Sequence, residues 1–259
     1  MRLRDVGWVW EGQGIDPGVY PSMYGLGEGC KYFGLARANF LFHPNDRYAL
    51  EKLAHLDEIT CDISQSYPGY DREGVDRSRL GSPEGTRGEA ERVSRLSLEF
   101  PNVSGGFFDD LKGIMKKHGY SVEQLAATRA ALASHNSALR MWGVVYGHEL
   151  DDADFWGSVA PHIDIINLWV WQSSDLDKLD GYVERSRELF PGKPVIIGCY
   201  LRDYGIPAPV PVERLAFQFG RIVDHLNRGR IAGYSILGAV LIDGQREQAQ
   251  WVRDFIAAH

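Results

Sequence analysis

Short apolar segments rich in β-forming residues alternate with helix-like segments along the whole chain of 259 residues. Eight such segments occur, at residues 6–10, 38–42, 58–62, 105–109, 140–146, 163–171, 194–200 and 234–242. Helix signals lie between them, at residues 47–55, 84–100, 121–135, 175–190, 211–228 and 247–258. Alternation of this kind is typical of α/β folds built on a parallel sheet.

The number of these segments narrows the choice among α/β folds. Segments such as 163–166 and 195–197 are apolar on both faces, as expected of parallel strands covered by helices. Eight strand–helix repeats in a chain of this length predict one (β/α)8 TIM barrel spanning residues 1–259. A doubly wound sheet is the alternative, but it has fewer strands and often a glycine-rich phosphate turn. The glycine-rich segment 25–29 does not follow a strand directly and has no lysine, which favours a loop with a short helix.

Composition excludes several classes of function. The net charge of −7 argues against a nucleic-acid-binding protein, which needs a basic surface. No stretch approaches the roughly 18 apolar residues of a membrane span. The start of the chain has no apolar leader, which is expected of a cytoplasmic protein or of one whose signal peptide has been removed. Cys30, Cys61 and Cys199 lack the spacing of a disulfide framework or a zinc site. No feature specifies an oligomeric state.

Polar and aromatic residues gather where the predicted strands end. The active sites of (β/α)8 barrels lie at that end, so these residues are the candidates for function. They are Trp10, Glu11, His43, Asn45, Asp62, Asp109, Asp110, Tyr146, His148, Glu149, Trp169, Trp171, Gln172, Tyr200, Arg202, Asp203 and Asp243. Any single acid in such a position is explained as well by helix capping. The collective pattern indicates a site.

The fourth and fifth predicted strands supply the candidate catalytic acids. The fourth ends in Asp109 and Asp110, and adjacent strand residues point to opposite faces, so one of the two is expected at the barrel mouth. Asp109 is preferred because it ends the apolar segment directly. Glu149 follows the fifth strand and is the predicted partner, one acid protonated and the other ionised. In the alternative interpretation, Glu149 or Asp151 only begins the next helix.

The remaining candidates are predicted to bind substrate. Trp10, Tyr146, Trp169, Trp171 and Tyr200 could stack on sugar rings, whereas Trp142 and Trp251 are assigned to the core. Polar contacts are expected from Glu11, His43, Asp62, His148 and Asp203. The long loop at residues 64–88 could cover one side of the mouth and contribute arginine or tyrosine contacts, or it could be only a solvated charged loop. It contains Tyr67, Tyr70, Asp71, Arg72, Glu73, Asp76, Arg77 and Arg79.

The segment Gly-Gly-Phe-Phe-Asp-Asp (105–110), with its neighbouring acids and a tryptophan-rich sixth strand, resembles the glycoside hydrolases of the TIM-barrel type. The whole chain resembles uncharacterised bacterial barrel proteins that carry Gly-Trp-Val-Trp-Glu-Gly-Gln-Gly (7–14) and Gly-Cys-Tyr-Leu-Arg-Asp-Tyr (198–204). In many retaining barrel hydrolases, a Glu ends strand four and a nucleophilic Glu lies on strand seven. Here strand four ends in Asp-Asp, and strand seven offers Tyr200 and Asp203. The catalytic arrangement that the sequence still allows pairs Asp109 or Asp110 with Glu149.

These observations predict a carbohydrate-active enzyme, a glycoside hydrolase that uses paired carboxylates and needs neither cofactor nor metal. Two alternatives stay open. A metal-dependent barrel hydrolase or isomerase would draw on His43, Asp62, Asp109, His148, Glu149 and Asp243, although the chain has no His-x-His on its first strand and no His-Glu-x-x-His. A sugar-binding barrel without catalytic activity would bind sugars with the aromatic residues, and its carboxylates would serve only in solvation.

Overall fold

The computed structural model describes residues 2–11, 22–41, 43–64 and 81–259. In these ranges eight parallel strands close a barrel in the order β1, β10, β7, β6, β5, β4, β3, β2. The strands are β1 (Gly7–Trp10), β2 (Arg37–Phe40), β3 (Glu58–Asp62), β4 (Val103–Phe108), β5 (Arg140–Tyr146), β6 (Ile165–Trp169), β7 (Val195–Tyr200) and β10 (Gly233–Leu237). The predicted (β/α)8 TIM-barrel fold is confirmed.

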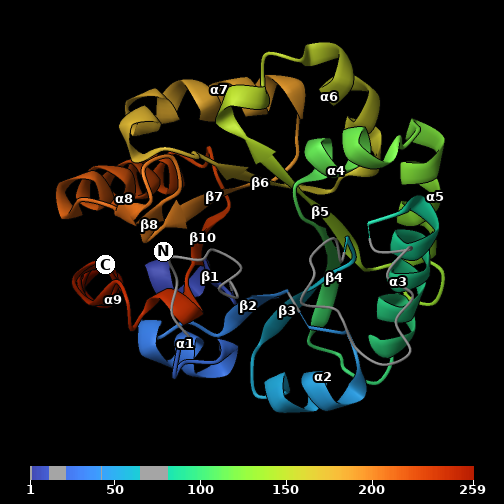
Figure 1. Cartoon of the computed structure of the whole chain (residues 1–259), viewed down its shortest axis with the longest axis horizontal. Coiled ribbons are helices and arrows are strands. Elements are labelled where there is room, and N and C mark those ends of the chain that lie inside the picture. The colour runs from blue at the N-terminus through green and yellow to red at the C-terminus, as the bar shows by residue number, and fades with distance from the viewer. Residues whose placement is uncertain (1, 12–21, 42, 65–80) are drawn as a thin grey trace.

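Helices surround this barrel on its outside (Figure 1). They are α1 (Leu26–Phe33), α2 (Arg47–Leu53), α3 (Pro83–Leu96), α4 (Leu111–His118), α5 (Val122–Leu132), α6 (Ala153–Val159), α7 (Leu179–Leu189), α8 (Val212–Asn227) and α9 (Arg246–Ala258). Short 3-10 turns are η1 (Leu3–Asp5), η4 (Gly147–Glu149), η5 (Ala160–His162), η6 (Ser173–Lys178) and η7 (Ala239–Leu241). A two-stranded antiparallel hairpin, β8 (Arg202–Asp203) with β9 (Ala208–Pro209), follows β7.

Two strands are shorter than their apolar segments predict. The segment 234–242 was predicted as one strand, but β10 ends at Leu237 and the chain turns at Gly238 into η7. The segment 163–171 contributes only Ile165–Trp169 to β6. Apolarity alone does not separate a strand from the short helical turn that follows it, because both are buried here.

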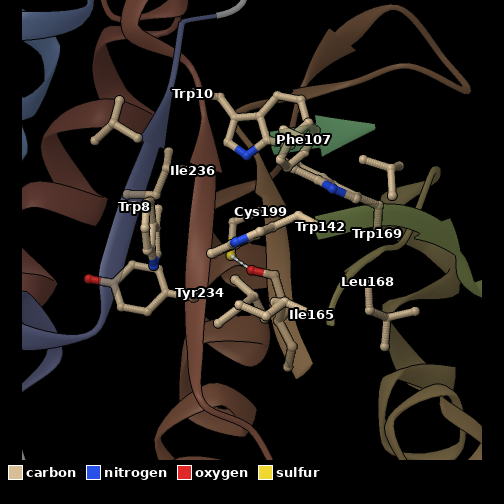
Figure 2. Close-up of a cluster of buried hydrophobic side chains, with 14 of the residues drawn as sticks. Trp8, Trp10, Phe107, Trp142, Ile165, Leu168, Trp169, Cys199, Tyr234 and Ile236 are labelled. Carbon is tan, nitrogen blue, oxygen red and sulfur yellow. Dashed lines mark hydrogen bonds between the residues drawn. The ribbon is translucent and has the colours of Figure 1, made fainter. Parts of the chain in front are cut away.

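The barrel interior is filled by aromatic side chains. Trp8 packs edge-on against Trp142, with ring centroids 4.7 Å apart. Above them, Trp10 packs against Phe107 at 4.3 Å and against Trp169 at 5.0 Å. Figure 2 shows these five rings in one cluster drawn from β1, β4, β5 and β6. Since large rings already fill this volume, the interior has no room for a ligand, and the barrel mouth is where a site is expected.

Buried polar side chains tie neighbouring strands together within the same interior. The Asn39 amide donates to the Thr60 hydroxyl at 2.7 Å and accepts from the Ser235 hydroxyl at 3.3 Å. On the other side of the barrel, the Asn167 amide of β6 donates to the Ile196 carbonyl of β7 at 3.1 Å and accepts the Trp169 indole N–H at 2.8 Å. These bonds hold the strand ends, and therefore the side chains of the mouth, in fixed register.

No helix in the described ranges combines the length and apolarity that crossing a membrane requires.

Candidate active site

The alternation of side chains along β4 determines which way its terminal acids point. Phe107 contacts the interior rings of Trp10 and Trp142, whereas Phe108 packs outward against Tyr120. Asp109 is two residues beyond Phe107 and therefore continues the inward face. It is buried, and its Oδ1 accepts the backbone N–H of Asp110 at 2.9 Å.

Asp110 has an unusual backbone. It is the only described non-glycine residue with positive φ, at φ 42° and ψ 42°. It occupies the N-cap position of α4, yet its side chain makes no capping hydrogen bond. Capping side chains are present on α2, α3, α5 and α6, from Asp46, Ser82, Ser121 and Asp152. The capping explanation therefore fails for Asp110.

The carboxylate of Asp110 instead meets a tyrosine from the neighbouring strand. The Tyr146 hydroxyl at the end of β5 donates to Asp110 Oδ1 at 2.5 Å. Burial raises the pKa of Tyr146 well above its usual value, and the neighbouring Tyr200, Asp110 and Asp109 raise it further. Burial likewise raises the pKa of Tyr200, again with help from Asp110. Both phenols therefore stay protonated at neutral pH, and Tyr146 serves as the hydrogen-bond donor to Asp110.

Glu149 lies in η4, directly after β5. Burial raises the pKa of its carboxyl group, and the charge of Asp110 adds to that rise. Hydrogen bonding from the Tyr146 backbone N–H, at 3.4 Å, and the positive charges of Lys112 and His148 oppose it. The charge of Asp110 thus disfavours ionisation of Glu149.

The turn that carries Glu149 is held from below. Its backbone carbonyl accepts the Trp156 indole N–H at 2.8 Å and the Lys112 ammonium at 3.5 Å. Lys112 also pairs with Asp152 at 3.0 Å. Nothing in the sequence pattern pointed to Lys112, whose position on α4 becomes relevant only through the fold.

The predicted aromatic residues divide into two groups. Trp10 and Trp169 are 4% and 2% exposed and belong to the interior cluster of Figure 2. Trp171 is 40% exposed. Its ring packs edge-on against Tyr146 at 5.6 Å and lies against Tyr204 at 5.5 Å.

His148 and Tyr200 complete this side of the mouth. His148 stacks on Tyr146 with centroids 5.7 Å apart, and Tyr200 lies between Trp169 and Tyr204, at 4.6 and 5.1 Å. The structure therefore brings seven of the predicted residues together, namely Asp109, Asp110, Tyr146, His148, Glu149, Trp171 and Tyr200. Tyr204 was not among the predicted site residues.

Glu11 and His43 form a separate pair on the β1–β2 side of the barrel. His43 Nε2 lies 3.0 Å from Glu11 Oε1. Burial raises the pKa of Glu11, and the hydrogen bond to His43 opposes the rise. Both residues line a cavity of about 880 Å³ between α1 and α2.

Three further strand-end acids are engaged by nearby groups. Asp62 Oδ1 accepts the backbone N–H and the hydroxyl of Ser64, at 2.8 and 2.6 Å. Asp203 accepts three backbone N–H groups of the adjacent loops. Asp243 accepts the Ser22 hydroxyl and the Met23 N–H. Each of these carboxylates fastens a loop.

Two observations concern the hypothesis of a metal site and the contacts predicted from the long loop. Within the described ranges, no group of three or more His, Cys, Asp or Glu side chains is placed to hold a metal ion. The arginine and tyrosine residues predicted to contribute from the long loop, from Tyr67 to Arg79, lie outside the described residues.

No protein-family model and no curated protein matches the chain. Solved structures do match it over nearly its whole length. A family 18 chitinase from Crocus vernus is 14% identical, with a TM-score of 0.57 over 96% of this chain and 99% of the chitinase. The GH53 catalytic domain from Ignisphaera aggregans is 12% identical, with a TM-score of 0.60 over 92% and 86%. The PgaB (BpsB) glycoside hydrolase domain from Bordetella bronchiseptica is 12% identical, with a TM-score of 0.54 over 96% and 97%. At such identities the similarity shows the fold, which this chain shares with glycoside hydrolases.

Proposed function

We propose that the protein is a carbohydrate-active enzyme that hydrolyses glycosidic bonds with the carboxyl groups of Asp110 and Glu149. The observation that carries the proposal is the state of Asp110. Its backbone is left-handed, its side chain leaves the cap of α4 unused, and its carboxylate is held by the Tyr146 hydroxyl. Strained residues of this kind cluster at functional sites, and a structural role as a helix cap is excluded. The shared fold with glycoside hydrolases supports the same reaction class.

In the proposed mechanism Glu149 is the general acid. Its raised pKa keeps the carboxyl group protonated at a higher pH than a free glutamate, so that it can protonate the leaving glycosidic oxygen. Asp110 is the ionised partner, which attacks the anomeric carbon or activates the water that does so. If Asp110 attacks, the water that later releases the sugar gives its hydroxyl to the anomeric carbon and its proton to Glu149. If Asp110 instead activates the water, Asp110 takes that proton, and exchange with solvent restores both carboxyl groups.

The neighbouring residues position this pair. Asp109 accepts the Asp110 N–H and so fixes the peptide between them. The hydroxyl of Tyr146 fixes the carboxylate of Asp110, and Tyr200 lies close enough for the charge of Asp110 to raise its pKa. The reaction needs no redox cofactor, because no electrons are transferred.

The test is turnover on a panel of aryl glycosides and oligosaccharides, measured with and without a chelator. Asp110→Asn and Glu149→Gln should each lower kcat by about 10²- to 10⁴-fold, whereas Asp109→Asn, which keeps an acceptor for the Asp110 N–H, should lower it less. Asp154→Asn, an exposed acid on α6, is the matched control and should leave kcat unchanged.

The outcomes separate the alternatives. Loss of turnover on chelation would favour a metal-dependent barrel, and saturable sugar binding without turnover would favour a binding protein. If Glu149→Gln leaves kcat unchanged while the aspartate variants abolish it, the second carboxyl group must be sought at Asp203, Asp62 or Glu11.

A further inference from the structure

The loops that follow β6 and β7 are locked to each other through Asp203. This side chain is buried, and its Oδ2 accepts the backbone N–H of Ser173 at 2.7 Å. Its Oδ1 accepts the N–H groups of Gly205 and Ile206, at 2.8 and 3.2 Å. Burial alone would raise the pKa of Asp203, but a hydrogen bond from the Ser173 side chain, together with these backbone hydrogen bonds, outweighs it and lowers the pKa. One carboxylate thus fixes the β8–β9 hairpin to a loop 30 residues away in the chain.

Two further contacts secure the same junction. A Cβ at Gly205 would lie 2.3 Å from Cγ of Gln172, so the Gln172 side chain packs directly on the Gly205 backbone and would have to move to admit a larger residue. Arg214 of α8 donates to the Ser173 carbonyl at 3.0 and 2.7 Å. The relative position of the two loops is therefore over-determined.

This junction places one aromatic ring from each loop side by side. Trp171 comes from the β6 loop and Tyr204 from the hairpin, with centroids 5.5 Å apart and planes inclined by 35°. The pair forms a surface of two rings, here called the Trp171–Tyr204 platform. Trp171 remains 40% exposed although its loop is firmly held. A large apolar side chain that is rigid and yet exposed at a barrel mouth is typical of a ligand contact.

The platform lies next to the proposed catalytic acids. Tyr146 packs edge-on against Trp171 at 5.6 Å, and the same tyrosine donates to Asp110 at 2.5 Å. A single side chain therefore separates the exposed indole from the carboxylate. This spacing suits a sugar ring adjacent to the ring whose bond is cleaved.

We propose that the Trp171–Tyr204 platform is a sugar-binding subsite adjacent to Asp110, and that Asp203 is the residue that positions it. The proposal rests on the proposed glycosidase function. The ligand is an oligosaccharide whose second ring presents a flat apolar face of C–H groups, as gluco-configured rings do because their hydroxyl groups are equatorial. Such a face stacks on indole and phenol rings.

The experiment measures binding and turnover separately. Cellotetraose and chitotetraose are titrated by calorimetry into the Glu149→Gln variant, in which turnover is suppressed. Adding Trp171→Ala should weaken binding by about tenfold, Tyr204→Ala by a smaller factor, and Trp171→Phe by about twofold. Tyr48→Ala removes an exposed ring on α2, away from the platform, and should leave the affinity unchanged.

The positioning role of Asp203 requires its own readout. In the otherwise intact enzyme, Asp203→Asn should raise KM for the tetrasaccharide and leave kcat within about twofold, because Asn retains one acceptor for the loop N–H groups. KM for an aryl monosaccharide, which does not reach the platform, should not change. A fall in kcat with unchanged KM would overturn the positioning role.

The results distinguish this proposal from the proposed function. If Trp171→Ala binds the tetrasaccharides as tightly as the parent, or if neither sugar binds the parent, the subsite is wrong. The glycosidase proposal then still stands wherever Asp110→Asn abolishes turnover. If binding depends on Trp171 but no glycoside is cleaved, the subsite is supported and the glycosidase proposal fails.

Discussion

The packing beneath the candidate site can be tested at Gly198, in the middle of β7. A Cβ at this position would lie 2.0, 2.2 and 2.4 Å from three ring atoms of Trp169. An ordinary contact begins at 3.4 Å, so Gly198→Ala forces the indole to move by about 1.4 Å. We therefore expect this one added methyl group to destabilise the barrel.

The size of the effect follows from what restrains Trp169. Its N–H is bonded to Asn167 at 2.8 Å, and its ring packs against Trp10 and Tyr200, at 5.0 and 4.6 Å. Overpacking costs about 1–3 kcal/mol, and breaking the buried hydrogen bond costs a similar amount. The free energy of unfolding should fall by about 2–5 kcal/mol.

The assay is urea unfolding followed by far-UV circular dichroism, with Gly220→Ala as the control. Gly220 lies within α8 and has no atom within 4 Å of an added Cβ. That substitution should raise the free energy of unfolding by about 0.5–1 kcal/mol, because alanine favours helix. If Gly198→Ala is as stable as the parent to within about 0.5 kcal/mol, the packing argument is refuted.

Three further predictions concern the site itself. Tyr146→Phe removes the hydroxyl bonded to Asp110, a hydrogen bond to a charged group worth about 1.5–3 kcal/mol, so kcat should fall about 10- to 100-fold; an unchanged kcat would leave Tyr146 a packing residue only. The lowered pKa of Asp203 stabilises the fold above its unfolded value of 3.8, and this stabilisation is lost as the pH falls through the lower folded pKa. Asp203→Asn should therefore be less stable than the parent at neutral pH, with the gap closing in acid. The raised pKa of Glu149 keeps this carboxyl group protonated, and therefore able to act as the acid, at pH values above 4.5. We expect kcat to decline as the pH rises through that raised pKa, and the residual kcat of Glu149→Gln to lack this decline.

The fold was predictable because the strand–helix period repeats eight times. Each repeat is a local pattern, and errors at one boundary do not change the count. The boundaries themselves were less secure, as the short η7 turn after β10 shows. The helix α4 went unrecognised because it directly follows Asp109 and Asp110 without a capping side chain.

The location of the candidate site was predictable for the same reason, but its division into groups was not. The sequence pattern does not distinguish one strand-end acid from another, because the groups that bond to each acid come from distant segments of the chain. Asp203 is engaged by Ser173 and Glu11 by His43, and neither pairing has a sequence signature. Only contacts made in the folded chain separate an acid that fastens a loop from one that faces a ligand.

The choice between Asp109 and Asp110 rests on a backbone angle that no residue pattern encodes. Strict alternation would direct Asp110 away from the mouth, towards the helices. The left-handed conformation ends the strand geometry at this residue, and the side chain is bonded to Tyr146 of the next strand. Such a conformation costs a non-glycine residue about 1–3 kcal/mol, and glycine would avoid the cost. The hydrogen bond between Tyr146 and the Asp110 carboxylate contributes a free energy of comparable size, and so it offsets the cost of the left-handed conformation. Replacing Asp110 by Gly should therefore leave the protein nearly as stable as the parent and yet inactive, a combination that a purely structural aspartate would not produce.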